Sequence, residues 1–206
     1  MTKIKSIGVY CGASDNVPQI FKDAAHDFGK LLADHDIDMV YGGGRVGLMG
    51  ITAKAAMDNG GKVYGIIPRF LDNHEGGYSD ITELTYVESM HERKHIMFEK
   101  SDAFVILPGG FGTLDELCEV LTWKQIALHK KYIFIIDING YWSPIFKTAV
   151  EVMVQNGFLR KEDKNLFTLI ERVEDMLPLL TVEAPDEQEN YVSKFGFAGQ
   201  DMDSVM

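Results

Sequence analysis

Short β-branched runs alternate with helix-length amphipathic segments along most of this chain, and that alternation most constrains its fold. It is typical of βαβ units, in which strands joined by crossover helices lie parallel in one sheet. We therefore predict an α/β fold with a single doubly wound, mostly parallel sheet of about seven strands. The runs that read as strands end at Tyr10, Tyr41, Ile67, Glu88, Leu107, Asp137 and Ile170.

Helices are expected in the intervals between these strands. Proline at positions 18 and 144 suits a first helical turn, and glycine at positions 60 and 157 suits a helix end. The expected helices span residues 18–33, 47–59, 89–100, 113–129, 144–156 and 171–180.

The composition indicates one globular domain. The chain has 206 residues, 46% of them hydrophobic, which suffices for a single ordinary core. Periodicity ends near residue 182, so we expect residues 1–182 to form the domain. Residues 183–206 carry six acidic side chains against one lysine, and we expect an acidic, flexible tail there.

The net charge and the number of cysteines indicate which binding partners are disfavoured and in which cellular compartment the protein is expected. The net charge of -11, with no basic cluster, argues against nucleic acid or an anionic membrane as the main partner. No apolar run approaches the roughly 20 residues that span a bilayer, and the first residues carry no signal-peptide pattern. Two cysteines are too few for a disulfide framework, so a cytoplasmic location is expected.

Ligands of a doubly wound sheet bind at the carboxyl ends of its strands, and three of these ends carry small residues. One of them, "GGGRVG" at residues 42–47, formally matches a dinucleotide-binding motif. It follows the second strand, however, and the next strand ends in Pro68 and Arg69 without the expected acidic residue. A tight turn with close helix packing is the alternative. Neither glycine loop contains the Lys-Ser/Thr pair of a P-loop.

The stretch "PGGFGTLDE", residues 108–116, is more specific. Gly109 and Gly110 let the backbone approach a ligand, and a helix beginning near Thr113 would present N–H groups to a phosphate. The alternative is a capping box, T-x-x-E, in which Thr113 is the N-cap and Glu116 bonds back to it. In that case Asp115 and Glu116 would only complement the helix dipole.

A second polar stretch, "SMHERKH", opens the helix expected at residues 89–100. Arg93 and Lys94 lie in its first turns, where positive charge is unfavourable unless solvent or an anionic ligand offsets it. His91 and His95 are spaced i, i+4 as in some metal sites. No third ligand lies at a helpful spacing, so surface or packing roles are favoured and no metal site is predicted.

"PGGFGTLDE" and "MHERK", at this separation, resemble the LONELY GUY (LOG) family of cytokinin riboside 5′-monophosphate phosphoribohydrolases. The resemblance extends from Ile4 to about Ile170 and includes "CGAS", "GGGRVGLMG" and "IIPRFL". It implies a Rossmann-like fold and hydrolysis of the N-glycosidic bond of a purine (cytokinin riboside or adenosine) 5′-monophosphate to free base and ribose 5-phosphate. Similar chains have been described as lysine decarboxylases, but no lysine here has a recognisable pyridoxal phosphate setting.

Carried over residue by residue, the resemblance implies that Arg93 and Glu116 are catalytic. It implies no cofactor and no metal, and a homodimer with the pocket near the subunit interface. The helix "ELCEVLTWKQIAL" could make that contact, although Leu121 and Trp123 are equally suited to the core. The implied substrate-binding residues are Ser14, Gly43, Gly44, Glu75, Met90, Arg93, Lys94, Gly109, Gly110, Phe111, Gly112, Thr113, Leu114, Asp115, Glu116 and Thr122.

Two positions depart from the usual family pattern. Asp115 stands where many members have Glu, and Ala13 of "CGAS" is often Ser. Because Glu116 is present, we expect the chemistry to be retained, with base preference or affinity open to change.

The implied mechanism divides the roles. A carboxylate near C1′ can stabilise an oxocarbenium-like sugar and deprotonate water, which is the role assigned to Glu116. Arg93 stays protonated and so cannot act as a base; it can orient the nucleotide or the carboxylate and can offset charge on the departing base. The alternative is a non-catalytic carrier of a nucleotide or of the molybdenum cofactor, while a DNA-processing module is disfavoured by the acidic charge. The sequence leaves open which monophosphate is the physiological substrate.

Overall fold

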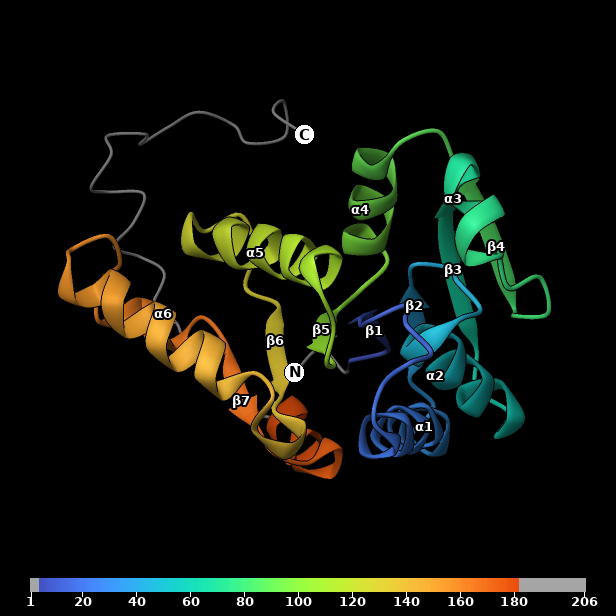
Figure 1. Cartoon of the computed structure of the whole chain (residues 1–206), viewed down its shortest axis with the longest axis horizontal. Helices are drawn as coiled ribbons and strands as arrows, with labels where there is room; N and C mark the ends of the chain where they lie inside the picture. The colour runs from blue at the N-terminus through green and yellow to red at the C-terminus, as the bar shows by residue number, and fades with distance from the viewer. Residues whose placement is uncertain (1–3, 182–206) are drawn as a thin grey trace.

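Seven parallel strands form one sheet in the order β4-β3-β2-β1-β5-β6-β7 within residues 4–181, the part of the chain that the computed structural model describes (Figure 1). The side chains of 73–75 and 180–181 are outside that description. The α/β prediction is confirmed, and every neighbouring pair is parallel. The strands are β1 (Ser6–Tyr10), β2 (Asp38–Tyr41), β3 (Val63–Pro68), β4 (Glu83–Val87), β5 (Ala103–Ile106), β6 (Tyr132–Ile136) and β7 (Thr168–Ile170).

Helices follow most strands, and five of the predicted ones are confirmed to within a few residues. The segment 171–180 is a 3₁₀-helix instead, because Pro178 within it has no N–H for the α-helical ladder. The short α3 was not predicted. The helices are α1 (Gln19–Asp34), α2 (Gly47–Asp58), α3 (Arg69–Glu75), α4 (Met90–Glu99), α5 (Phe111–Gln125), α6 (Ser143–Gln155), η1 (Ile138–Gly140), η2 (Glu162–Asn165) and η3 (Val173–Thr181).

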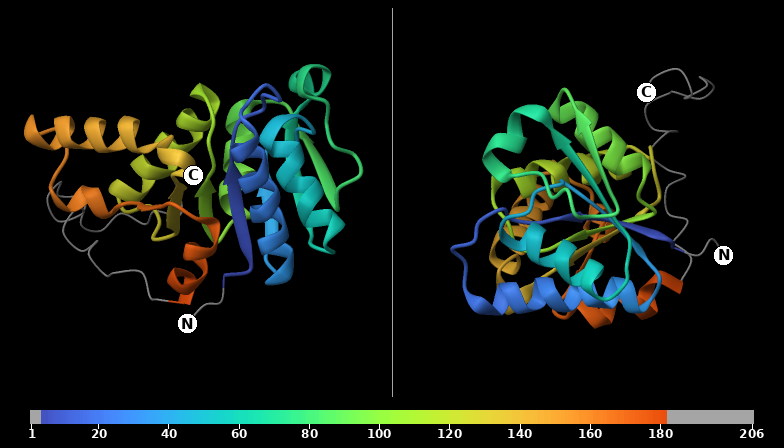
Figure 2. Two further views of the ribbon diagram at one scale, coloured as in Figure 1. Left: turned by 60° about the horizontal axis from the view of Figure 1, so that its bottom comes forward. Right: turned by 90° about the vertical axis from the view of Figure 1, so that its right-hand side faces the viewer.

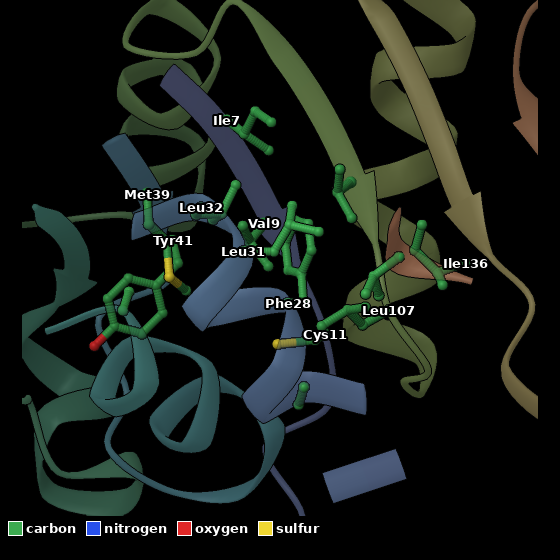
Figure 3. Close-up of a cluster of buried hydrophobic side chains, with 14 of the residues drawn as sticks. Ile7, Val9, Cys11, Phe28, Leu31, Leu32, Met39, Tyr41, Leu107 and Ile136 are labelled. Atoms are coloured by element: carbon green, nitrogen blue, oxygen red, sulfur yellow. The ribbon is translucent and has the colours of Figure 1, made fainter. Parts of the chain in front are cut away.

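Different helices cover the two faces of the sheet (Figure 2). Ile7 and Val9 of β1 point toward α1, α2 and η3, where Phe28 of α1 is fully buried (Figure 3). Tyr10 points the other way, toward α4, α5 and α6. Because successive side chains of a strand alternate between faces, a sheet covered on both sides needs apolar residues at nearly every position. The strand runs have that composition.

The order of the strands reverses between β1 and β5. The chain builds outward from β1 to β4, then crosses back so that β5 pairs with the other side of β1, with Tyr10 opposite Ile106. A crevice forms where crossovers leave in opposite directions, outside the carboxyl ends of the two strands. The fold therefore places the loops that follow β1 and β5 beside each other.

Two predictions about the chain as a whole are not tested. The tail, 183–206, lies outside the described residues, so its expected flexibility and the domain boundary at 182 stay predictions. Within 4–181, the longest apolar helices fall short of what a bilayer crossing requires.

The contact between α1 and α2 depends on a glycine. Gly29 lies in α1, and a Cβ built on it would fall 2.2 Å from the carbonyl oxygen of Thr52 in α2. A distance of that kind to backbone requires one helix to move. The two helices pack closely because Gly29 has no side chain.

We expect Gly29→Ala to lower the free energy of unfolding by roughly 1–3 kcal/mol, as overpacked cores do. Alanine would add about 1 kcal/mol of helix propensity, so a net loss means that the clash with α2 outweighs it. Denaturant unfolding measures the difference. His26→Ala, on the exposed side of the same helix, is the control and should change little; an alanine variant as stable as wild type would contradict the packing argument.

Candidate active site

The loops after β1 and β5 meet by backbone contact. Gly12 N–H donates to the carbonyl oxygen of Pro108 at 3.0 Å. A Cβ on Gly109 would lie 2.1 Å from the Thr113 hydroxyl oxygen and 3.0 Å from the Gly12 nitrogen. The two loops can approach this closely only with glycine at position 109. This contact brings the start of α5 to the crevice at the switch point.

A cavity of about 560 Å³ opens at this meeting point. Its lining includes the polar or charged residues Ser14, Arg93, Thr113 and Glu116, whereas most of the other lining residues are apolar or glycine. A volume of this size suits a small organic ligand. The lining is made by Cys11, Gly12, Ala13, Ser14, Val17, Pro18, Phe21, Leu48, Met49, Met90, Arg93, Pro108, Gly109, Gly110, Gly112, Thr113, Glu116 and Tyr141.

Two glycine-rich helix starts border the cavity. At one of them, the first N–H groups are hydrogen-bonded to other residues of this protein. At α2, the Asp15 carboxylate accepts from Gly47 N–H at 2.8 Å, and Leu48 N–H donates to the Gly12 carbonyl at 3.0 Å. A Cβ on Gly47 would lie 2.3 Å from the Ala13 carbonyl carbon. The "GGGRVG" loop therefore packs against the loop after β1, which supports the tight-turn interpretation over a dinucleotide site.

The start of α5 is arranged differently. Its N-cap is Gly110, which has no side chain with which to cap the first-turn N–H groups. Gly110, Gly112 and Thr113 all line the cavity. The N–H groups and the positive end of the helix dipole therefore face the same space, which is a favourable place for an anion.

The capping box at Thr113, which the sequence left open as the alternative to a phosphate site, does not form. Thr113 is the third residue of α5, so it cannot be the N-cap, and Glu116 lies in the second turn. Side-chain capping does occur at α4, where the N-cap Ser89 accepts through Oγ from Glu92 N–H at 3.1 Å, and Glu92 Oε2 accepts from the N–H of Glu88, the residue before the N-cap, at 2.9 Å. Glu116 has no capping role, and it lines the cavity.

Arg93 lies in the cavity wall with only 5% of its surface exposed. Its Nε donates to the Ile66 carbonyl at 3.1 Å, and its Nη2 donates to the Gly42 carbonyl at 2.9 Å. A Cβ on Gly42 would lie 1.8 Å from that Nη2. The first glycine of "GGGRVG" therefore admits the guanidinium rather than a phosphate.

Glu116 faces the same part of the cavity from α5. The carboxylate is 8% exposed, and its Oε1 lies 4.0 Å from Nη1 of Arg93. A carboxylate and a guanidinium so placed attract strongly, because little water screens them. The fold thus brings the two residues that the sequence singled out together at the switch point.

Burial sets the protonation of two neighbours of this pair. The pKa of the Cys11 thiol is raised far above its usual range, first by burial and then by the Glu116 charge. The pKa of Tyr10 is raised for the same two reasons. Cys11 therefore stays a neutral thiol in the cavity wall, and it is a poor nucleophile because the thiolate is the reactive form.

Lys94 does not line the cavity and lies between two helices instead. Its Nζ lies 2.7 Å from Glu119 Oε2 and 3.2 Å from Asp115 Oδ2, so it joins α4 to α5. Burial would lower the pKa of Lys94, but the hydrogen bonds to these two carboxylates raise it overall. The clamp holds the helix that carries Arg93 beside the helix that carries Glu116.

Eight of the predicted site residues line the cavity, and eight do not. Thr122 is exposed and its hydroxyl donates to the Cys118 carbonyl, while Phe111 is 89% exposed. The backbone of Glu75 ends α3, and its side chain is not described. Contact of these outer residues with substrate stays a prediction. Outside the lining lie Gly43, Gly44, Glu75, Lys94, Phe111, Leu114, Asp115 and Thr122.

Sequence reasoning missed most of the apolar wall. Val17 comes from the loop before α1, Phe21 from the first turn of α1, Leu48 and Met49 from α2, and Tyr141 from the turn before α6. Each reads as an ordinary apolar or turn residue in the sequence. These residues become neighbours only because the tertiary structure packs their helices and loops around the ends of β1 and β5.

Fold and site together define a class, the Rossmann-like α/β proteins that hold a small ligand at the switch point of a parallel sheet. The structure is similar to the molybdenum cofactor binding protein of Rippkaea orientalis, with a TM-score of 0.65 and 20% identity over 87% of this chain and 96% of that one. Identity at that level shows the fold alone.

Relatives in sequence give the family. A family model described as possible lysine decarboxylase matches residues 49–180. The chain is 36% identical over 201 residues to the probable cytokinin riboside 5′-monophosphate phosphoribohydrolase LOGL2 of Oryza sativa subsp. japonica, covering 98% of this chain and 82% of the relative. It is 37% identical over 184 residues to the corresponding LOG3 enzyme of Arabidopsis thaliana, covering 89% and 85%. The chain belongs to the LOG family.

We expect Arg93→Met to lower the free energy of unfolding by about 3 kcal/mol, because it leaves two carbonyls without their donors and a buried carboxylate without its cation. Thermal or denaturant unfolding measures the loss. Arg69→Met is the matched control: Arg69 pairs with Glu88 on the surface, and such pairs contribute about 0–1 kcal/mol. Equal losses in both variants would show that the buried hydrogen bonds of Arg93 contribute little.

Proposed function

We propose that this protein hydrolyses the N-glycosidic bond of a purine nucleoside 5′-monophosphate, releasing free base and ribose 5-phosphate. The observation that carries the proposal is the buried pair, with Glu116 Oε1 and Arg93 Nη1 4.0 Å apart. The pair lies one turn beyond the helix start at Gly110, which accepts an anion. Membership of the LOG family supports the same reaction.

The 5′-phosphate binds at the start of α5. First-turn N–H groups have no partner within their own helix, and here Gly110, Gly112 and Thr113 border the cavity. A protein with a net charge of -11 must attract an anion through such a local arrangement. Phosphate binding fixes the distant, reacting carbon, so substrates without phosphate should react more slowly.

Glu116 acts at the sugar. Cleavage of an N-glycosidic bond passes through an oxocarbenium-like state, and a carboxylate beside C1′ stabilises that positive charge. The same carboxylate can take a proton from the attacking water, so the water oxygen bonds to C1′ as the C1′–N bond breaks; the base leaves with the electron pair of that bond and takes up a proton, which gives the free base. Arg93 stays protonated and orients the nucleotide or Glu116. It does so through Nη1, because Nε and Nη2 donate to backbone carbonyls.

The base occupies the apolar side of the cavity. Val17, Phe21 and Met49 border it there, and none of them carries a charge. A flat purine and an apolar substituent on its N6 both suit such a wall. We propose a purine monophosphate, AMP or an N6-modified relative, as the substrate class.

A carrier role is the weaker alternative. The molybdenum cofactor binding protein of Rippkaea orientalis shares the fold at 20% identity, which supports the fold alone. A carrier needs no buried carboxylate beside the ligand, whereas Glu116 is 8% exposed in the cavity wall. The pair of Arg93 and Glu116 therefore favours hydrolysis.

We expect Glu116→Gln to lower kcat for AMP by about 10²–10⁴-fold, because the amide can neither deprotonate water nor carry charge. Product chromatography measures release of free base. The fold should persist, since Glu116 has no capping role. Glu119→Gln, one turn further along α5 and paired with Lys94, is the matched control and should keep most of the activity.

Two outcomes would contradict this proposal in different ways. If folded wild-type protein released no free base from any nucleoside 5′-monophosphate, the proposed hydrolase activity would be wrong. Unchanged turnover in Glu116→Gln would remove only Glu116 from the mechanism.

We also propose a homodimer in the cytoplasm. Exposed apolar side chains occur on α6 and at the end of α5, including Val152 at 51% and Ile126 at 36% exposure. Leu121 and Trp123, in contrast, pack against the core. Only Phe146 of α6 is buried among the described residues, so most of that helix is free to meet a second copy. Both cysteines are free, in keeping with a reducing compartment.

We expect wild type to sediment at twice the chain mass of 23.1 kDa and the double variant Ile126→Glu, Val152→Glu to sediment as a monomer. Charges buried in an apolar interface are unfavourable, which is why dissociation is expected. Ile20→Glu, 47% exposed on the opposite face of the sheet, is the control. A wild-type monomer at every concentration would contradict the dimer.

A further inference from the structure

Tyr141 holds the glycine loop that begins α5. It lies in the turn between β6 and α6 and borders the cavity. Its hydroxyl donates to the carbonyl oxygen of Gly109 at 2.7 Å. Gly109 directly precedes the N-cap, Gly110. The bond therefore reaches the last peptide before the N–H groups that the proposed phosphate contacts.

The turn that carries Tyr141 is itself firmly held. The Asp137 carboxylate accepts from Trp142 N–H at 2.7 Å and Ser143 N–H at 2.9 Å, and also from the Ser143 hydroxyl. Asn139 and Gly140 have φ of 52° and 69°, a left-handed path that reverses the chain.

The ring of Tyr141 is fixed from two sides. It packs edge-to-face against Trp142, with centroids 4.9 Å apart, and against Phe21 of α1 at 5.6 Å. Pairs of this geometry add to the stability that burial provides. Turn and packing together leave the hydroxyl with a defined position.

The glycine loop before α5 depends on hydrogen bonds for its conformation, because packing does not restrain all of its residues. A Cβ on Gly110 would meet nothing within 4 Å, so no neighbouring group packs against that position, and a glycine there has a wide choice of backbone angles. A hydrogen bond from Gly12 N–H fixes the carbonyl of Pro108, and the Tyr141 hydroxyl fixes the next carbonyl, that of Gly109. Two consecutive carbonyls are thus held from opposite loops.

Fixing the Gly109 carbonyl also orients a donor. A peptide unit is planar and trans, so the N–H of Gly110 points opposite to the C=O of Gly109. With the oxygen held by Tyr141, that N–H is set before a ligand arrives. Preset donors bind an anion more tightly, because the loop loses less conformational freedom on binding.

We propose that Tyr141 is a positioning residue for the 5′-phosphate: its hydroxyl orients the Gly109–Gly110 peptide so that the start of α5 is ready to bind the anion. This inference rests on the function proposed above. It assigns Tyr141 no contact with the reacting atoms. Its effect is confined to substrates that carry the phosphate.

The test is Tyr141→Phe, which keeps the ring against Phe21 and Trp142 and removes only the hydroxyl. Loss of one neutral hydrogen bond corresponds to about a 3- to 10-fold change in an equilibrium constant. We expect KM for AMP to rise by about that factor, with kcat for AMP and kcat/KM for adenosine unchanged. The preference for AMP over adenosine falls accordingly, a change that general loosening of the fold would not produce.

Tyr86→Phe is the matched control. It removes a hydroxyl that donates to Asp72 at 3.2 Å, away from the cavity, and should leave both substrates unaffected. Thermal unfolding of both variants checks that they are folded. An unchanged KM for AMP in Tyr141→Phe, or an equal loss with adenosine, would overturn the inference.

Calorimetry separates this inference from the proposed reaction. AMP binding is compared between Glu116→Gln and the double variant Glu116→Gln, Tyr141→Phe, neither of which needs to turn over. Weaker AMP binding in the double variant supports the role of Tyr141 even if wild type hydrolyses nothing, which would defeat only the proposed function. Equal affinities, or no AMP binding by either protein, overturn the role of Tyr141.

Discussion

The parallel pairing of β1 with β5 is the constraint on which the rest of the structure depends. Asp102 secures one end of the pair, where its carboxylate accepts from the backbone N–H of Lys5, 97 residues earlier, at 2.8 Å. At the other end Gly12 N–H bonds to the Pro108 carbonyl at 3.0 Å. These contacts place the loop after β1 against the start of α5, and the cavity exists because the crossovers on either side diverge.

Arg93 joins the fold to the chemistry. Its two backbone bonds tie α4 to the ends of β2 and β3, and its remaining edge faces Glu116 across 4.0 Å. Burying two ionised groups is unfavourable unless both are well paired, so such a pair is weak evidence for stability alone. Burial of such a pair is expected where one of the charges stabilises a transition state, the role that we propose for Glu116. The guanidinium of Arg93 then helps to hold the Glu116 carboxylate in place.

Much of the architecture could be read from the sequence because periodicity reports burial directly. The seven strands and five of the helices follow from apolar runs between glycine and proline breaks. The start of α5 could not be fixed this way, since T-x-x-E at Thr113 fits a capping box and an interior turn equally well. The helix begins at Phe111, directly after two carbonyls that distant loops hold: that of Pro108 by the N–H of Gly12 and that of Gly109 by the hydroxyl of Tyr141.

The sequence by itself determined the fold class and, through its resemblance to the LOG family, singled out the two residues for which we propose catalytic roles. Alternating apolar runs require a two-faced parallel sheet, and the stretches that contain Arg93 and Glu116 carry the resemblance to the LOG family. Only the tertiary structure decided which neighbours share the cavity. It paired Lys94 with Glu119 and packed the Arg93 guanidinium against Gly42. It also brought Phe21 and Tyr141 to the cavity lining. The physical reason is that strand order is set by long-range pairing, which leaves no local pattern in the residues it brings together.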